Sequence, residues 1–418
     1  MTAGAGVGLP LQGLRVMDLS LLLPGPLCTM LLADWGAEVI KVEARLGGDP
    51  LRAGPNPVRH DSAYFLGVNR NKKSLALDLR REAGRAVAQR LAARCDVLVE
   101  SYRPGKAAKL GLGYADLAAA NPRLIYCSLS GYGQDGPWAG HGGHDLGFLA
   151  LSGVLSLLGE AGGPPLAPGL PLADVAGGFM AAAAILAALV RRERSGQGCV
   201  IDASLYEAAS YWLAPLVTAC LSAGAKAERG RMGLTGAWPC YGVYATRDGR
   251  HMALAAVEPY FWADFCRRMG REEWLPHGRA EGAEGERVRA EVAALFAGRT
   301  QTEWIALLAG ADVCCEPVLE VDEALQHPQA RARRLVAEVE SAGEGRLAQA
   351  GPPPLGAVRT PPPRLGEHTA EVLQELGYSS AEVQALVDSR AVGIQISSCP
   401  AGACRAGGAG PRRRPPNP

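Results

Sequence analysis

The residues best able to do chemistry are an imidazole and a carboxylate on either side of an apolar run. His144 precedes the hydrophobic stretch 146–158, and Asp174 follows a Gly/Pro-rich loop and opens an alanine-rich segment. Such a pair can supply two bases on opposite faces of one carbon, or one nucleophile and one helper. Proton transfer and covalent group transfer are therefore both open.

Two further carboxylates could assist this pair. A lone histidine is more often structural, but the two glycines before His144 allow close approach of a substrate, and the apolar residues after it exclude water. Asp145 is expected to help position His144. Glu258 follows an apolar segment and precedes a proline, which fits a helix cap. A carboxylate there could also orient a histidine that belongs to another domain.

Basic side chains near predicted strand edges form a second candidate feature. Lys72 and Lys73 lie in one basic turn, and Tyr102, Arg103 and Lys109 lie in or near another. A charge run is usually a solvated surface. Turns beside the exits of parallel strands are also where open α/β sheets bind ligands, so a phosphate site is an equal alternative.

Composition excludes several classes of function. The 418 residues carry a net charge of only +1, which gives no reason to propose nucleic acid or an anionic membrane as partner. The 11 cysteines include no CxxC pair or zinc spacing, so no metal site is expected and a reduced, cytoplasmic compartment fits. The N-terminus lacks signal-peptide features, and segment 175–190 predicts a buried helix, too short to span a bilayer.

The pattern of elements predicts an α/β fold with a smaller second domain. Predicted strands alternate with helices over residues 11–130, which is typical of an open parallel sheet. From about residue 215 a hairpin pattern with Asp-Gly at its turn (241–256) and short helices predict a small α+β domain over 215–330. Residues 331–392 are expected to return to the large domain of residues 1–214, and 393–418 to be disordered.

A glycine motif follows one predicted strand. Residues 131–136 fit G-x-G-x-x-G, which alone would suggest a dinucleotide site. Pro137 follows at once, and no apolar helix opens on the third glycine, so a close-packed turn near a ligand is favoured instead.

As an ordered set, these segments resemble the family that unites the type III CoA-transferases with 2-methylacyl-CoA racemase. The similar stretches are 11–16, 24–26, 33–43, 69–74, 131–137, 173–174, 196–202 and 366–369. The resemblance covers about residues 9–390 and implies a Rossmann-like large domain built from both chain ends, with the smaller domain inserted. It also implies an interlocked homodimer, in which the small domain of one chain covers the CoA-binding large domain of the other. Glu258 could then reach His144 of the other chain.

The resemblance also implies roles for individual residues. Asp174 matches the aspartate that transferases use as a nucleophile and racemases use as a proton carrier. His144 and Asp145 match the racemase branch, as does the segment around Glu258. The stretches 69–74 and 132–137 look more like transferases. Ala44 stands where racemases often have a CoA-binding arginine, and the adjacent Arg45 could replace it.

These observations together predict an acyl-CoA enzyme that inverts a 2-methyl centre. Its acyl-CoA substrate would bring coenzyme A, and no metal or redox cofactor would be needed. The alternative is transfer of CoA between two carboxylic acids through Asp174. A non-catalytic acyl-CoA-binding protein is disfavoured, because His144, Asp174 and Glu258 are all present.

Overall fold

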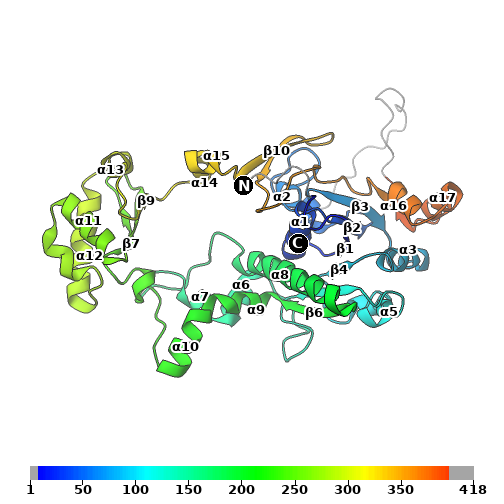
Figure 1. Ribbon diagram of the computed structural model, residues 1–418, viewed down its shortest axis with the longest axis horizontal. Helices are drawn as coiled ribbons and strands as arrows, with labels where there is room; N and C mark the ends of the chain where they lie inside the picture. The colour runs from blue at the N-terminus through cyan, green and yellow to red at the C-terminus, as the bar shows by residue number, and fades with distance from the viewer. Residues whose placement is uncertain (1–7, 395–418) are drawn as a thin grey trace, which may run out of the picture.

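Two lobes of unequal size make up the molecule, and two chain segments join them (Figure 1). The computed structural model describes residues 8–394. Most of the chain predicted to be disordered, residues 395–418, therefore lies outside the described residues.

The large lobe is built on a seven-stranded, mainly parallel sheet. Its strands are β1 (Arg15–Leu19), β2 (Glu38–Ala44), β3 (Lys72–Leu77), β4 (Val97–Glu100), β5 (Ile125–Ser130), β6 (Cys199–Ser204) and β12 (Val392–Gly393). The order is β12-β3-β2-β1-β4-β5-β6, and only β12 is antiparallel to its neighbour. β1 and β4 are parallel, but strands β2 and β3 are added on one side of β1 and strands β4 to β6 on the other. Open α/β sheets bind ligands at such a switch point in strand order.

Helices cover both faces of the sheet because neighbouring strand residues point to opposite sides. Val16 faces a core formed with α1 (Pro24–Asp34), α6 (Asp145–Ser152), α8 (Leu172–Ser195) and α9 (Leu205–Ser210). Met17 faces a second core with α3 (Glu82–Ala92), α5 (Tyr114–Ala118), α16 (Thr369–Glu375) and α17 (Ser380–Asp388). Because α16, α17 and β12 come from the end of the chain, both ends build this lobe.

Helix α8 packs unusually close to its neighbours. A Cβ on Gly178 would lie 2.8 Å from the Pro24 carbonyl oxygen, and one on Gly177 would lie 2.2 Å from a Leu205 methyl carbon. Glycine at these positions therefore lets the start of α8 rest on α1 and α9. By length and composition α8 could cross a membrane, but core helices pass the same test, and α8 packs on the sheet.

The small lobe has its own core. Its antiparallel sheet consists of β7 (Tyr241–Ala245), β8 (His251–Ala255) and β9 (Cys315–Pro317). The helices α11 (Pro259–Met269), α12 (Gly282–Ala297) and α13 (Gln301–Leu308) pack against it. The predicted hairpin is confirmed, and Gly249 at its turn has a φ of +75°.

The connecting segments leave from and return to the large lobe. α10 (Ala214–Ala223) leads out of it, while α14 (Val321–Gln326) and α15 (Pro328–Ala332) lead back to the hairpin of β10 (Val336–Ser341) and β11 (Gly345–Ala350) (Figure 1). The chain also contains the short helices α2 (Ala63–Gly67), α4 (Lys106–Lys109) and α7 (Val154–Leu157).

Candidate active site

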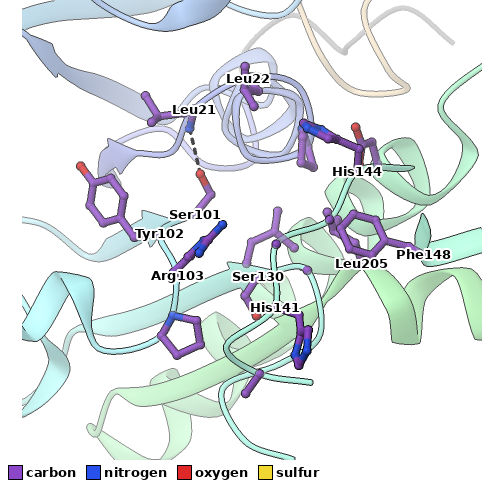
Figure 2. A pocket seen from close by; sticks show the side chains of 18 residues that line it. Leu21, Leu22, Ser101, Tyr102, Arg103, Ser130, His141, His144, Phe148 and Leu205 are labelled. Carbon is purple, nitrogen blue, oxygen red and sulfur yellow. Dashed lines mark hydrogen bonds between the residues drawn. The ribbon is translucent and has the colours of Figure 1, made fainter. Parts of the chain in front are cut away.

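A cavity of about 460 Å³ lies at the switch point of the large sheet. The turns after β1, β4 and β5 and the first turns of α6 and α8 surround it. Its lining includes Leu21, Leu22, Tyr102, Arg103, Ser130, His141, His144, Phe148, Asp174 and Leu205. Figure 2 shows His144 on one side of this space and Tyr102 and Arg103 on the other.

The structure brings His144 and Asp174 to the same cavity, although they are distant in sequence. His144 is the N-cap residue of α6, and Asp174 lies in the first turn of α8. Both side chains therefore sit beside helix N-termini, where unpaired backbone N–H groups and the helix dipole favour negative charge.

The carboxyl group of Asp174 has a strongly raised pKa. Burial and the charge of Asp145 together raise the pKa of its carboxyl group to about 6, and His144 opposes this increase. A carboxyl group with a pKa close to neutrality can both accept and donate a proton under physiological conditions.

Asp145 contacts the backbone that carries Asp174. Its Oδ1 accepts hydrogen bonds from the N–H groups of Ala173, at 2.7 Å, and Asp174, at 3.0 Å. A residue of α6 thereby caps the N-terminus of α8. The sequence predicted a positioning role toward His144, whereas these hydrogen bonds orient Asp174.

The turn between β1 and α1 forms the facing wall of the cavity. The Leu21 N–H donates to Ser101 Oγ at 2.9 Å, which ties this turn to the one after β4 (Figure 2). Leu22 has a φ of +63°, a left-handed conformation that costs a residue with a side chain about 1–2 kcal/mol. The wall is therefore held in an unfavourable backbone geometry.

A second cavity, of about 550 Å³, adjoins the first and shares Leu21 and Tyr102 with it. Arg45, Arg80 and Lys106 line it, and Lys106 Nζ lies 4.5 Å from the centroid of the Tyr102 ring. Arg45 Nε is buried with no hydrogen-bond partner within residues 8–394. Glu43 and Asp78 also line this cavity, and Arg80 forms an ion pair with Asp78 at 2.9 Å. Arg45, with its unused donor, and Lys106 are therefore the cations best placed for a ligand with phosphate groups.

Lys72 and Lys73, predicted to contact CoA, line neither of the two cavities. They begin β3, so they lie at the edge of the sheet opposite the cavities. Lys72 is buried and forms an ion pair with Asp18 at 3.1 Å, while Lys73 forms ion pairs with Glu38 and Glu371. Their charges are therefore already neutralised within the protein.

Lys109 and Glu258 also lie away from the cavities of their own chain. Lys109 ends α4 and lines neither cavity, whereas Lys106 at the start of the same helix lines the second. Glu258 is exposed at the N-cap of α11 and lines neither cavity. Helix α11 lies in the small lobe, away from the large sheet (Figure 1). One chain alone does not bring Glu258 to His144.

Sequence analysis missed Arg80 and His141 at these cavities, and it selected Lys109 where the structure places Lys106. Arg80 comes just after β3, where a search of the strand exits would have found it. Lys106 belongs to the same basic stretch as Arg103, but helix phase decides which lysine faces the cavity. His141 lines the first cavity and packs against Trp138, with 4.7 Å between the ring centroids and the two rings tilted. Within the described part of the chain no cluster of three or more potential metal ligands occurs.

Comparison with known proteins identifies the relatives of this chain. A family model described as "CoA-transferase family III" matches residues 11–369. The chain is 42% identical to the mouse "Alpha-methylacyl-CoA racemase", covering 91% of this chain and 97% of that protein. It is 35% identical to the mouse "Succinyl-CoA:glutarate CoA-transferase", covering 91% and 89%. The crystal structure of a CAIB/BAIF family protein from Brucella suis superposes with a TM-score of 0.77 at 31% identity, covering 88% and 100%.

Proposed function

The chain belongs to CoA-transferase family III, and from this premise we propose that it inverts the configuration at C2 of a 2-methylacyl-CoA. Proteins of this family use CoA thioesters as substrates. The observation that carries the proposal is the convergence of His144 and Asp174 on one cavity, with the pKa of Asp174 raised to about 6. The relationship to the mouse racemase supports it.

Inversion at this carbon needs two groups that exchange one proton through an enolate. The thioester acidifies the hydrogen on C2. One of His144 and Asp174 removes that proton, and the other returns a proton to the opposite face. The negative charge that develops on the thioester oxygen is stabilised by backbone N–H groups at the start of α6, beside Asp145.

The two cavities divide the substrate between them. We place the CoA phosphates in the second cavity, beside Arg45, Arg80 and Lys106. The thioester arm passes Tyr102, which lines both cavities, and reaches the first. Burial raises the pKa of Tyr102 to about 12, so its phenol stays neutral next to the anionic ligand.

The first cavity suits an apolar acyl chain. Leu21, Leu22, Phe148 and Leu205 contribute to its walls. Arg103 is the one lysine or arginine that lines it among the described residues. Such a wall favours a hydrocarbon chain over the carboxylate of an acceptor acid, because an unpaired carboxylate there would lose its hydration.

CoA transfer remains the second candidate, because Asp174 also suits it. The Asp174 carboxylate would attack the thioester carbonyl, the C–S bond would break, and the CoA thiolate would leave behind a mixed anhydride. The relationship to the mouse transferase supports this alternative. It requires a second carboxylic acid, whereas inversion does not.

A second copy of the chain is proposed to complete the site. Helix α10 is apolar but has no buried residue, and Leu221 on it is 83% exposed. Tyr211 just after α9 and Val217 of α10 are also exposed, and they line one shallow hollow together with Met180 of α8, so exposed apolar side chains of neighbouring helices meet there. Covering it with a second copy, in an interlocked arrangement, would let Glu258 of that copy approach His144.

The proposed reaction is tested by measuring whether the enzyme converts one epimer into the other when no acceptor acid is present. Purified enzyme is incubated with one epimer of a 2-methylacyl-CoA and no other carboxylic acid, and both epimers are measured by chiral chromatography after hydrolysis. We expect the two epimers to become equal in amount. An unchanged epimer, combined with CoA transfer once a second acid is added, would establish the transferase instead.

A further inference from the structure

The strained turn in the cavity wall has a specific support. Leu22 carries a side chain in a backbone region that favours glycine, with a φ of +63°, and it lines the first cavity. Strained residues persist only where the surrounding structure imposes the conformation. Leu22 must therefore have a neighbouring group that imposes the left-handed conformation.

Asp49, in the loop after β2, supports this conformation. The Leu22 N–H donates to Asp49 Oδ1 at 3.1 Å, and the same oxygen accepts from the Leu51 N–H at 2.9 Å. The Asp49 N–H donates to Glu43 Oε2 at 3.1 Å, which fixes the loop that carries the carboxylate. Asp49 thus joins the cavity wall to β2.

Asp49 is itself held by a buried ion pair. Its Oδ2 lies 2.9 Å from Lys41 Nζ, and both side chains are fully buried. Lys41 Nζ also donates to the Ser20 carbonyl oxygen at 2.9 Å, so the pair contacts the strained turn at both Ser20 and Leu22. Burial alone would lower the pKa of Lys41, but the carboxylates of Asp18 and Asp49 raise it overall. The ammonium group therefore stays charged.

We infer that Asp49, paired with Lys41, is a positioning residue for the reaction: it holds Leu22 in the left-handed conformation that shapes the cavity wall facing His144 and Asp174. Buried ion pairs contribute little net stability, so a role in fixing one conformation explains this one better. The inference rests on the proposed use of this cavity for acyl-CoA chemistry. Asp49 touches no reacting atom.

A mutant cycle with position 22 separates positioning from general stability. Glycine adopts a φ of +63° without strain, so it should need Asp49 less. We expect Asp49→Ala to lower kcat by about 10- to 100-fold in the Leu22 background, because small displacements at an active site are costly. In a double variant with Leu22→Gly, Asp49→Ala should lower kcat by less than about threefold. In a double variant with Leu22→Ala, which removes the side chain but keeps the strain, the loss of kcat should stay large.

A matched control uses another buried, ion-paired aspartate of the same lobe. Asp34 pairs with Arg70 at 2.7 Å and has no hydrogen bond to the turn. Asp34→Ala should change kcat by the same factor whether residue 22 is leucine or glycine. If Asp49→Ala does not fold, Asp49→Asn, which keeps an acceptor oxygen but loses the ion pair, replaces it in the cycle.

The cycle is measured on whichever of the two reactions the wild-type enzyme catalyses. A wild type that transfers CoA without inversion would overturn the proposed function but leave this test intact. An equal loss from Asp49→Ala in the Leu22, Ala and Gly backgrounds would overturn the inference, even if the proposed function holds.

Discussion

Asp174 is the residue on which both candidate reactions depend. Burial and the neighbouring Asp145 charge raise its pKa to about 6, so near neutrality its carboxyl group exists in both forms. The residue types at positions 144 and 174 could be found from the sequence. The raised pKa could not, because it arises from burial and from a charge on another helix.

The pH dependence of the rate follows from this pKa. Inversion in either direction needs one proton shared between His144 and Asp174, so both epimers should give the same bell-shaped profile. The acid limb should lie near pH 6, where the Asp174 carboxylate takes up a proton and the pair loses that base. Initial rates for each epimer against pH check this. A rate that rises through that region and then stays level would instead fit an ionised Asp174 acting alone as nucleophile.

At the scale of elements, strand ends and helix starts decide which side chains meet. Alternating strand and helix patterns in residues 11–130 predicted the parallel sheet, because buried parallel strands are short apolar runs. The same reasoning placed Lys72 and Lys73 wrongly. These two lysines begin β3 instead of following it, and the register with β2 shows that they lie at the opposite edge of the sheet.

The cap that Asp145 provides to α8 gives a prediction at this scale. Asp145→Ala removes the acceptor for the Ala173 and Asp174 N–H groups, so we expect a loss of about 1 kcal/mol in unfolding free energy and a lower kcat. Asp145→Asn keeps an acceptor oxygen and should restore most of the stability. Thermal unfolding and steady-state kinetics measure both effects. Equal stability of the Ala variant and wild type would contradict the cap.

The cations of the second cavity give another prediction. Arg80→Ala and Lys106→Ala should each weaken CoA binding by about tenfold at low salt, and by less at high salt, because exposed charge pairs are screened. Lys109→Ala is the matched control, since Lys109 lies on the same short helix outside both cavities. Isothermal titration with CoA measures all three. A loss at Lys109 equal to that at Lys106 would show that the cavity is not the binding site.

At the scale of the whole molecule, the separation of the lobes is the most consequential feature. The insertion of the small lobe could be anticipated from the change of pattern near residue 215. How the lobes are arranged could not, because a long connection leaves no local signal for its direction. Glu258 lies in the small lobe, away from the cavity of its own chain, so its predicted contact with His144 requires a second copy.

Mixing two inactive variants tests this requirement. His144→Ala and Glu258→Ala should each form defective homodimers. After unfolding and refolding together, mixed dimers should contain one intact site, with His144 from one chain and Glu258 from the other. Activity should therefore return to about one quarter of the wild-type value for random pairing. Sedimentation verifies that the particles contain two chains. No recovery of activity in verified mixed dimers would contradict the shared site.

The central claim is that His144 and Asp174 exchange the C2 proton of a 2-methylacyl-CoA with solvent. It is tested most directly by incubating the enzyme with one epimer in D₂O, without an acceptor acid, and measuring deuterium at C2 by mass spectrometry. We predict one deuterium at C2 as the epimers equalise. His144→Ala and Asp174→Ala should each abolish inversion, while slow exchange persists through the remaining base. Wild-type enzyme that moves CoA between acids and leaves C2 free of deuterium would contradict the account.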